Sequence, residues 1–292
     1  YEFYVQGDCT TDGTSLWVGP FAFTTPLACP APTSLDADNI TATSADLSWT
    51  IGDSESSWNI ELVDLTAGET VSGTASFTGV TNPYTLTNLS SANDYAYYVQ
   101  GDCSPNGDST WVGPYNFTTA CSAETPNYLE DFTSFLNSCW SEATGPITGP
   151  TSFGSSLWTV DGFANDGTSG SARVNIYTTG NDEWLLTPIF DLTGGGFEIN
   201  LDVALTAYTG TAAQTLNSDD AVYVMQSIDG GTTWTTIYTW DAANSPSNTG
   251  NNVTIDVSGV TSATVQFAIF SLEGSTSGGD MNFYVDNFQV RT

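Results

Sequence analysis

The chain has 292 residues, with 33 Asp and Glu against two basic residues, Arg173 and Arg291, and no His, which gives a formal net charge of −31. Without Lys or His, the sequence excludes a Schiff-base lysine, a Ser-His-Asp triad and an imidazole metal ligand. The shortage of Lys and Arg also excludes nucleic-acid binding and attachment to anionic lipid. No apolar run approaches the roughly 20 residues of a membrane helix, so we expect no membrane insertion. Carboxylate, hydroxyl, amide and aromatic chemistry remain, and 39% apolar residues are enough to build folded cores.

The first 25 residues return later in the chain as a repeat. Tyr1–Thr25 aligns without gaps on Tyr95–Thr119, with 16 of 25 positions identical at an offset of 94. A period of this size corresponds to one small β domain. We therefore expect residues 1–28 to be the C-terminal strands of a truncated domain and residues 29–121 to be a complete copy. On this interpretation the chain is a fragment of a longer array.

The complete copy alternates short runs rich in Val, Thr, Tyr and Trp with Gly, Asn, Asp and Pro, at a spacing typical of a β-sandwich. This pattern predicts an all-β fold of seven short strands without a helix. The predicted strands are Thr33–Leu35, Ala45–Thr50, Trp58–Leu65, Thr70–Phe77, Tyr84–Leu86, Tyr95–Gly101 and Trp111–Thr118.

Three segments of this copy resemble a fibronectin type III domain. CPAPTSL at Cys29–Leu35 resembles the opening strand of that family, and Trp49 resembles its core tryptophan. LSSANDY at Leu89–Tyr95 has the leucine and tyrosine spacing of the tyrosine corner, although Ser91 and Asn93 replace the usual proline and threonine. The resemblance covers roughly residues 1 to 120 and implies tandem fibronectin type III sandwiches.

The five cysteines fit this seven-strand arrangement. Cys103 and Cys121 lie at opposite ends of one strand, about 30 Å apart at roughly 3.3 Å per residue, which is too far for a disulfide. In such a sandwich the loop after the sixth strand lies at the same pole as the start of the first, which predicts a Cys29–Cys103 disulfide. Cys121 is then left for Cys139, and Cys9 has lost its partner with the missing part of its domain. Disulfides at module boundaries predict an oxidising, extracellular setting.

From Thr125 onward the strands are longer, the loops are rich in Gly, Ser and Asn, and no helical period occurs. Ten such strands predict a larger jelly-roll β-sandwich over residues 122–292. The predicted strands are Tyr128–Thr133, Leu157–Asp161, Ala172–Thr178, Glu183–Phe190, Phe197–Thr206, Ala221–Ser227, Thr233–Trp240, Asn252–Val257, Thr264–Phe270 and Asn282–Val290.

This region contains, in order, YLEDFTSFLNSCW, EWLLTPIFDL, VYVMQSIDGGTTW and the closing FYVDNFQV. In that order the four segments resemble the MAM-like or cleaved-adhesin jelly-roll modules of secreted surface proteins. Fibronectin type III repeats leading into such a module resemble the large adhesins that gliding bacteria export by type IX secretion. The resemblance implies a protein of the cell surface.

Jelly rolls of this kind often hold one Ca²⁺ ion where the first and last strands meet. Glu130 or Asp131 in the first strand and Asp286 in the last are the positions that resemble this arrangement. Calcium takes hard oxygen ligands and needs neither His nor Cys, so it suits this composition. Each of these acids also has the simpler interpretation of a solvated surface group.

Ser227, Asp229, Gly231 and Trp234 fit the Asp-box pattern S-x-D-x-G-x-x-W, which is known from sialidases. The structural interpretation is a hairpin in which the aspartate accepts turn amides, the glycine adopts positive φ and the tryptophan packs beneath. A sialidase would also need an arginine cluster for the substrate carboxylate, which two distant arginines do not supply.

Two further interpretations concern aromatic and acidic residues. A row of tryptophans can stack on sugars, but tryptophans in alternating strands are more often core residues. The five tryptophans in question are Trp140, Trp158, Trp184, Trp234 and Trp240. Paired carboxylates can also hydrolyse glycosides, but no pair here lies in a recognisable catalytic motif.

These features favour a non-enzymatic adhesion segment of a large extracellular, multidomain cell-surface protein, stapled by disulfides and stabilised by calcium. Its partner would be a cell-surface glycan or protein. A subunit of an extracellular filament or hook, with further copies of itself as partners, is the alternative. An accessory region of a secreted enzyme is the third interpretation.

Overall fold

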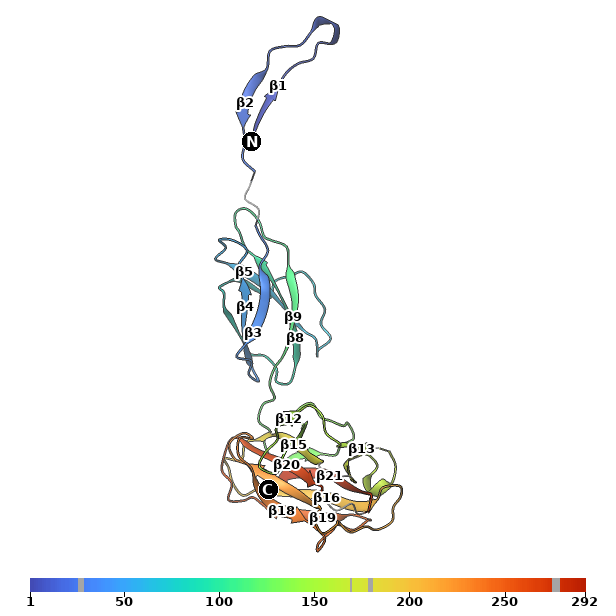
Figure 1. The fold of residues 1–292 in the computed structure, drawn as a ribbon. Helices are drawn as coiled ribbons and strands as arrows, with labels where there is room; N and C mark the ends of the chain where they lie inside the picture. Colours follow the sequence, from blue (N-terminus) through green and yellow to red (C-terminus); the bar gives the residue numbers. More distant parts are fainter. Residues whose placement is uncertain (26–28, 169, 178–180, 275–278) are drawn as a thin grey trace. The chain divides into compact units, whose positions relative to one another are not determined.

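The computed structural model describes residues 1–25, 29–168, 170–177, 181–274 and 279–292. These residues form two compact units, Tyr1–Ala120 and Cys121–Thr292, and the all-β prediction is confirmed (Figure 1). Helical geometry in the described residues is confined to two 3-10 turns, Thr10–Asp12 and Phe163–Asn165, and neither could cross a membrane. The end of the first predicted segment, residues 26–28, and the end of one predicted strand, Thr178, lie outside the described residues.

The first unit begins with a two-stranded hairpin of β1 (Glu2–Val5) and β2 (Val18–Ala22), in which Phe3 pairs with Phe21. Every residue of both strands is exposed. The apolar residues that alternate along these strands therefore pack against no second sheet in the described part of the chain.

The rest of the first unit is a sandwich of a three-stranded sheet, in the order β3-β4-β7, and a four-stranded sheet, in the order β6-β5-β8-β9. All strand pairs in it are antiparallel. The strands are β3 (Thr33–Asp38), β4 (Ser44–Thr50), β5 (Trp58–Asp64), β6 (Phe77–Val80), β7 (Tyr84–Thr87), β8 (Asp94–Gly101) and β9 (Val112–Thr118).

Aromatic side chains from both sheets fill the core of this sandwich. Trp49 of β4 and Trp58 of β5 meet edge to face, with ring centroids 5.5 Å apart. Tyr97 of β8 is fully buried, and its hydroxyl donates to the Asp36 carbonyl of the opposite sheet. Tyr95 accepts a hydrogen bond on its hydroxyl from the Ser90 backbone N–H at 2.9 Å, as a tyrosine corner requires.

The predicted strand Thr70–Phe77 is wrong except at its last residue, because β6 runs from Phe77 to Val80. Glu61 of β5 is buried, and its carboxylate accepts hydrogen bonds from the backbone N–H groups of Ser72 and Gly73. Gly73 has φ of 75°, which ends any extended run there. A side chain, rather than a strand ladder, therefore holds this segment.

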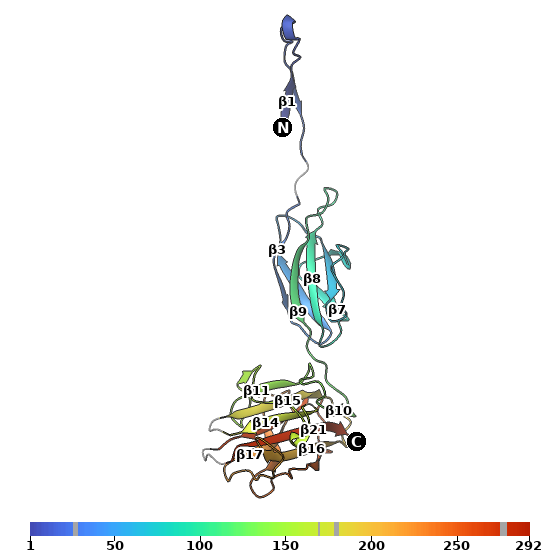
Figure 2. The same ribbon diagram turned by 90° about the vertical axis from the view of Figure 1, so that its right-hand side faces the viewer.

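The second unit contains two six-stranded sheets. One follows the order β13-β14-β21-β16-β19, with β10 also paired to β21, and the other follows β12-β11-β15-β20-β17-β18 (Figure 2). The strands are β10 (Tyr128–Glu130), β11 (Ser141–Thr144), β12 (Ser152–Phe153), β13 (Thr159–Asp161), β14 (Ser171–Ile176), β15 (Asp182–Phe190), β16 (Glu198–Ala207), β17 (Ala221–Ser227), β18 (Thr235–Trp240), β19 (Asn251–Asp256), β20 (Val265–Leu272) and β21 (Met281–Arg291).

Alternating apolar residues of both sheets share one large core, which includes Val203 and Phe283 of one sheet and Leu185 and Val224 of the other. A smaller cluster lies around Trp184 and Phe270 on the β15 and β20 strands. The sheets therefore pack face to face as a sandwich, and the second cluster covers the opposite face of one of them.

Two differences from the predicted strands concern the start of this unit. The predicted strand Tyr128–Thr133 ends at Glu130, because the Glu130 carboxylate accepts the Phe132 N–H and Phe132 adopts φ of 47°. The strands β11 and β12, of four and two residues, were not predicted, because such short segments have no readable alternation.

Candidate metal centre

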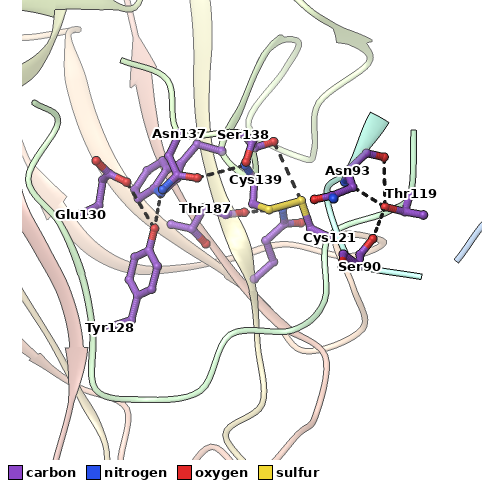
Figure 3. Close-up of a disulfide and its surroundings, with 12 residues drawn as sticks. Ser90, Asn93, Thr119, Cys121, Tyr128, Glu130, Asn137, Ser138, Cys139 and Thr187 are labelled. Carbon is purple, nitrogen blue, oxygen red and sulfur yellow. Dashed lines mark hydrogen bonds between the residues drawn. A yellow bond between two sulfur atoms is a disulfide. The ribbon is translucent and has the colours of Figure 1, made fainter. Parts of the chain in front are cut away.

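Both disulfides expected from the sequence are present. Cys29 pairs with Cys103 and Cys121 pairs with Cys139, each with a Cα–Cα distance of 5.8 Å. Cys9 is free and exposed. Figure 3 shows that Cys139 follows Asn137 and Ser138, and that Tyr128 directs its hydroxyl at Glu130. The Cys121–Cys139 bond thus ties the start of the second unit to the segment that follows β10.

The last strand carries a bulge at the proposed calcium position. In the β16–β21 ladder Asp202 pairs with Asp286 and Asn200 pairs with Gln289, so β21 has one extra residue between the two pairs. Asn287 lies in this bulge and adopts φ of 47°, a conformation that Asn tolerates better than most residues. On the other edge of β21, the partner changes from β14 to β10 across the same stretch. Asp286 therefore lies where three strands meet β21.

Asp202 is a member of this cluster that the sequence did not indicate. Its two carboxylate oxygens accept hydrogen bonds from the side-chain amides of Asn252, at 2.8 Å, and Asn287, at 3.0 Å. Asp286 accepts a hydrogen bond from the Asn287 backbone N–H. The bulge residue thus contacts both carboxylates and holds them near each other.

The acidic residues after the first strand lie in different surroundings. Glu130 is buried, with 5% exposure, and its carboxylate accepts hydrogen bonds from Phe132 N–H and the Tyr128 hydroxyl. Tyr128 in turn accepts a hydrogen bond from the Trp140 indole at 2.8 Å. Asp131 is exposed and binds Thr133, whose N–H and hydroxyl lower the pKa of Asp131.

Burial and like charge perturb two of these carboxyls. Burial raises the pKa of Asp286 to about 6 against the hydrogen bond from Asn287, and the charges of Asp202 and Asp131 add to the rise. Burial also raises the pKa of Glu130. Ionising a carboxyl group beside other carboxylates costs free energy unless a bound proton or cation neutralises the charge.

Neither arginine supplies that balance. Arg173 forms an ion pair with Asp161 at 2.9 Å, and Arg291 forms one with Glu198 at 2.9 Å. Because the sequence has no other basic side chain, any counter-charge at Asp286 must come from outside the chain.

The donor set fits a hard divalent cation, since all its members offer carboxylate or amide oxygen. Asp131 and Asp286 interact electrostatically, whereas Glu130 directs its carboxylate to donors within the protein. In the part of the chain that the structure describes, no three of the residues Glu130, Asp131, Asp202 and Asp286 have oxygens that all lie within 4.8 Å of one another, so a bound ion would require these side chains to move closer together. One group does meet that spacing, Cys29, Glu55 and Cys103, but its two sulfurs form a disulfide and are not thiolate ligands.

The Asp-box residues build the turn between β17 and β18. Asp229 accepts hydrogen bonds from the N–H groups of Thr232 and Thr233, and these and the Ser227 hydroxyl lower its pKa to about 2. Gly231 has φ of 88°, and its carbonyl accepts the Trp234 indole N–H. The polar groups of Ser227, Asp229 and Trp234 therefore form hydrogen bonds within the turn, as the structural interpretation of the motif predicts.

The tryptophans do not form an exposed sugar-stacking row. Four of them are at most 4% exposed, and Trp234, which is half-buried, packs on Trp184 with ring centroids 5.2 Å apart. The four buried tryptophans are Trp140, Trp158, Trp184 and Trp240. These four tryptophans are therefore core residues, as the simpler interpretation of the sequence predicted.

Comparison with known families identifies part of the first unit. Residues 30–118 match the fibronectin type III domain. The match includes the seven-strand sandwich, the Trp49 and Trp58 core and the tyrosine corner of Tyr95. No curated protein matches the chain.

Several solved structures are similar at low identity. The K1 cleaved adhesin domain of Lys-gingipain from Porphyromonas gingivalis is 16% identical, with 57% of this chain and 98% of that one covered and a TM-score of 0.39. A carbohydrate-binding module from the β-sandwich superfamily is 11% identical, with 91% and 100% covered and a TM-score of 0.38. TmCBM61 bound to β-1,4-galactotriose is 10% identical, with 56% and 97% covered and a TM-score of 0.33. At such low similarity, none of these structures assigns a ligand to the chain.

Proposed function

We propose that the chain is a non-enzymatic adhesion segment of a large extracellular, multidomain cell-surface protein, of the kind that type IX secretion exports. Its ligand is a cell-surface glycan or protein, and calcium stabilises its second unit. The observation that carries the proposal is a fibronectin type III domain followed by a second sandwich, with a disulfide in each unit.

The disulfides support an extracellular location. Bonds such as Cys29–Cys103 and Cys121–Cys139 persist in oxidising compartments and are rare in a reducing cytosol. The acidic surface suits the same surroundings, because dissolved salt screens the repulsion among exposed carboxylates. Both features are expected of a segment that works outside the cell.

The side-chain chemistry supports a binding role over catalysis. The sequence has no His or Lys to serve as a general base or an amine nucleophile near neutral pH. The Asp-box, the motif with the strongest link to enzymes, is occupied by turn hydrogen bonds around Asp229. Adhesion requires a stable shape and a binding surface, which two sandwiches provide.

The calcium site that we propose is the cluster of Asp131, Asp202 and Asp286. These carboxylates would hold the ion, with Glu130 as a further ligand if its side chain turns from Phe132. The ion would neutralise Asp286 and tie β10, β16 and β21 together. We assign the ion a structural role, which is to join these three strands.

A binding assay with the full chain tests the proposal. Labelled protein is applied in calcium buffer to a printed oligosaccharide array and to immobilised membrane-protein extracts, with and without EDTA. We expect saturable binding to at least one glycan or protein class, and weaker binding for Asp286→Asn, whereas Asp38→Asn, which removes an exposed charge from β3, binds normally. Absence of saturable binding on both surfaces would contradict an adhesive role.

A further inference from the structure

The Cys29–Cys103 disulfide of the first unit has a carboxylate beside it. Its two sulfurs and one carboxylate oxygen of Glu55 all lie within 4.8 Å of one another. A Cβ atom added to Gly101 would lie 3.5 Å from both Cys29 Sγ and Glu55 Cγ, so these side chains meet at one point of the sandwich pole. The Glu55 carboxylate therefore lies next to the disulfide itself.

One oxygen of this carboxylate has no hydrogen-bond donor. Glu55 Oε2 accepts the Asp53 backbone N–H at 2.8 Å, whereas Glu55 Oε1 is buried and has no hydrogen-bond partner among the described residues. Donors disperse the charge of a carboxylate, so an oxygen without a donor acts more strongly on its neighbours. Concentrated negative charge therefore lies beside the two sulfurs.

A polar pocket of about 260 Å³ lies beside Cys103, and its lining includes Asp53, Glu55 and Asp102. Asp102 accepts the Ser104 backbone N–H at 3.0 Å, and hydrogen bonds from Ser104 lower the pKa of Asp102. Both arginines of the sequence belong to the second unit, so neither compensates this charge within the first unit. A reagent that reaches Cys103 through this pocket therefore passes three acidic side chains.

The second disulfide lies in different surroundings. Cys121 is exposed and Cys139 is half-buried, whereas Cys29 and Cys103 are both half-buried. Among the described residues, no carboxylate oxygen lies within 4.8 Å of both sulfurs of the Cys121–Cys139 bond. The two disulfides of the chain therefore differ both in exposure and in the charge beside them.

Reduction of a disulfide by a low-molecular-weight thiol begins when its thiolate attacks one of the two sulfurs. A new S–S bond forms to the attacked sulfur, the original S–S bond breaks, and the other cysteine leaves as a thiolate. A second thiolate then attacks the mixed disulfide, which releases the second cysteine and leaves the reductant oxidised to its own disulfide. A carboxylate beside the bond disfavours both the approaching anion and the departing thiolate.

We propose that Glu55 protects the Cys29–Cys103 disulfide from anionic thiols, so that such thiols reduce the Cys121–Cys139 disulfide first. The Glu55 carboxylate repels the incoming thiolate and disfavours the thiolate that leaves. The protected bond links positions 74 residues apart in the fibronectin type III domain, whereas the other bond links positions 18 apart. A mild reductant would thus open the link in the second unit while the first unit keeps its own.

Reduction kinetics of the full chain test this proposal. The chain is treated with glutathione, which carries carboxylates, or with cysteamine, which carries an ammonium group, and each cysteine pair is followed by alkylation and peptide mapping. With glutathione, Cys121–Cys139 should be reduced before Cys29–Cys103.

Glu55→Gln should speed reduction of Cys29–Cys103 by glutathione about tenfold, an effect between the repulsion of charges in water and that near a protein surface. The acceleration should be smaller with cysteamine, because the carboxylate attracts its ammonium group. The matched variant Asp38→Asn, which removes an exposed charge from β3, should leave both rates unchanged.

Three results would overturn the proposal. One is no acceleration in Glu55→Gln, and another is an equal acceleration with both thiols, because loosening of the pole would not depend on the charge of the reagent. The third comes from the unchanged chain, which supplies the test even if Glu55→Gln does not fold. Replacing glutathione by cysteamine should raise the rate at Cys29–Cys103 relative to that at Cys121–Cys139, and a ratio that is the same for both thiols would contradict protection by charge.

Discussion

The two units differ in the carboxyl groups whose pKa is raised, since all of these among the described residues lie in the second unit. Exposed carboxyls with a lowered pKa, such as Asp46 and Asp229, occur in both units. In the fibronectin type III domain, Asp46 and Asp102 have lowered pKa values because side-chain and backbone donors bind them. Burial alone would raise the pKa of Glu61, but hydrogen bonds from Ser72 and Gly73 to its carboxylate outweigh burial and lower that pKa. In the second unit burial is the largest cause of a raised pKa at Glu130, Asp182, Glu183, Glu273 and Asp286.

This contrast shows how an acidic chain can build two sandwiches in different ways. The first unit satisfies its buried acid with hydrogen bonds and closes one pole with the Cys29–Cys103 disulfide. The second unit contains half-buried Asp286 and buried Glu273, and neither has a basic side chain beside it. The first unit should therefore depend on its disulfide, and the second should depend on protons or cations.

Removal of the first disulfide should have the largest effect. A link across 74 residues is worth about 4.5 kcal/mol in a loop-entropy estimate, so Cys29→Ser with Cys103→Ser should destabilise the first unit by that order. Urea unfolding followed by tryptophan fluorescence measures the loss. Cys9 occupies the position equivalent to Cys103 in the hairpin but is free, so Cys9→Ser is the matched control and should change nothing. An equal loss of stability in Cys9→Ser and in the double variant would contradict the dependence of the first unit on its disulfide.

The pH dependence of the metal-free chain should differ between the units. The folded pKa values of Asp286 and Glu273, about 6 and about 7, lie above their usual values of 3.8 and 4.5. The stability contributed by their protonated forms is therefore complete below about pH 4 and is lost as pH rises to about 7. Charges on Asp131 and Asp202 at one place, and on Asp220 and Asp280 at the other, increase this loss.

We expect the second unit to lose about 1 to 3 kcal/mol over this range, a value limited by the water around half-buried Asp286. The fibronectin type III domain should change little, because its shifted carboxyls have lowered pKa values and are already ionised at pH 5 and above. Unfolding in EDTA at several pH values measures both transitions. A flat profile for the second unit would contradict the raised pKa values.

Sequence patterns were sufficient for most of the architecture because buried and exposed residues alternate along most strands. They failed at Thr70–Phe77, where Ser, Thr and Val indicate a strand but the Glu61 carboxylate holds the backbone in a loop. The disulfides were predictable because two cysteines at one pole of a sandwich leave few alternatives.

The acidic sites were predictable only in part. Asp286 lies in a segment, FYVDNFQV, whose resemblance to adhesin modules pointed to a metal. Asp202 has no such signal, since an aspartate on the polar face of a strand is ordinary, and only the register between β16 and β21 places it opposite Asp286. Asp220 and Glu273, each one position beyond the paired Ala221 and Leu272, are 53 positions apart, and their proximity depends on the strand order of the finished sheet.

Differential scanning calorimetry of the full chain, in calcium and in EDTA, tests most directly whether the second unit alone depends on a cation. One site at a hundredfold excess of ligand over Kd contributes about 2.7 kcal/mol, or about 5 to 10 °C for a unit of this size. We predict that EDTA lowers the transition of the second unit by at least this amount, that Ca²⁺ restores it, and that the transition of the fibronectin type III domain stays in place. Transition temperatures that do not change in EDTA, or that fall equally for both units, would contradict a cation dependence of the second unit alone.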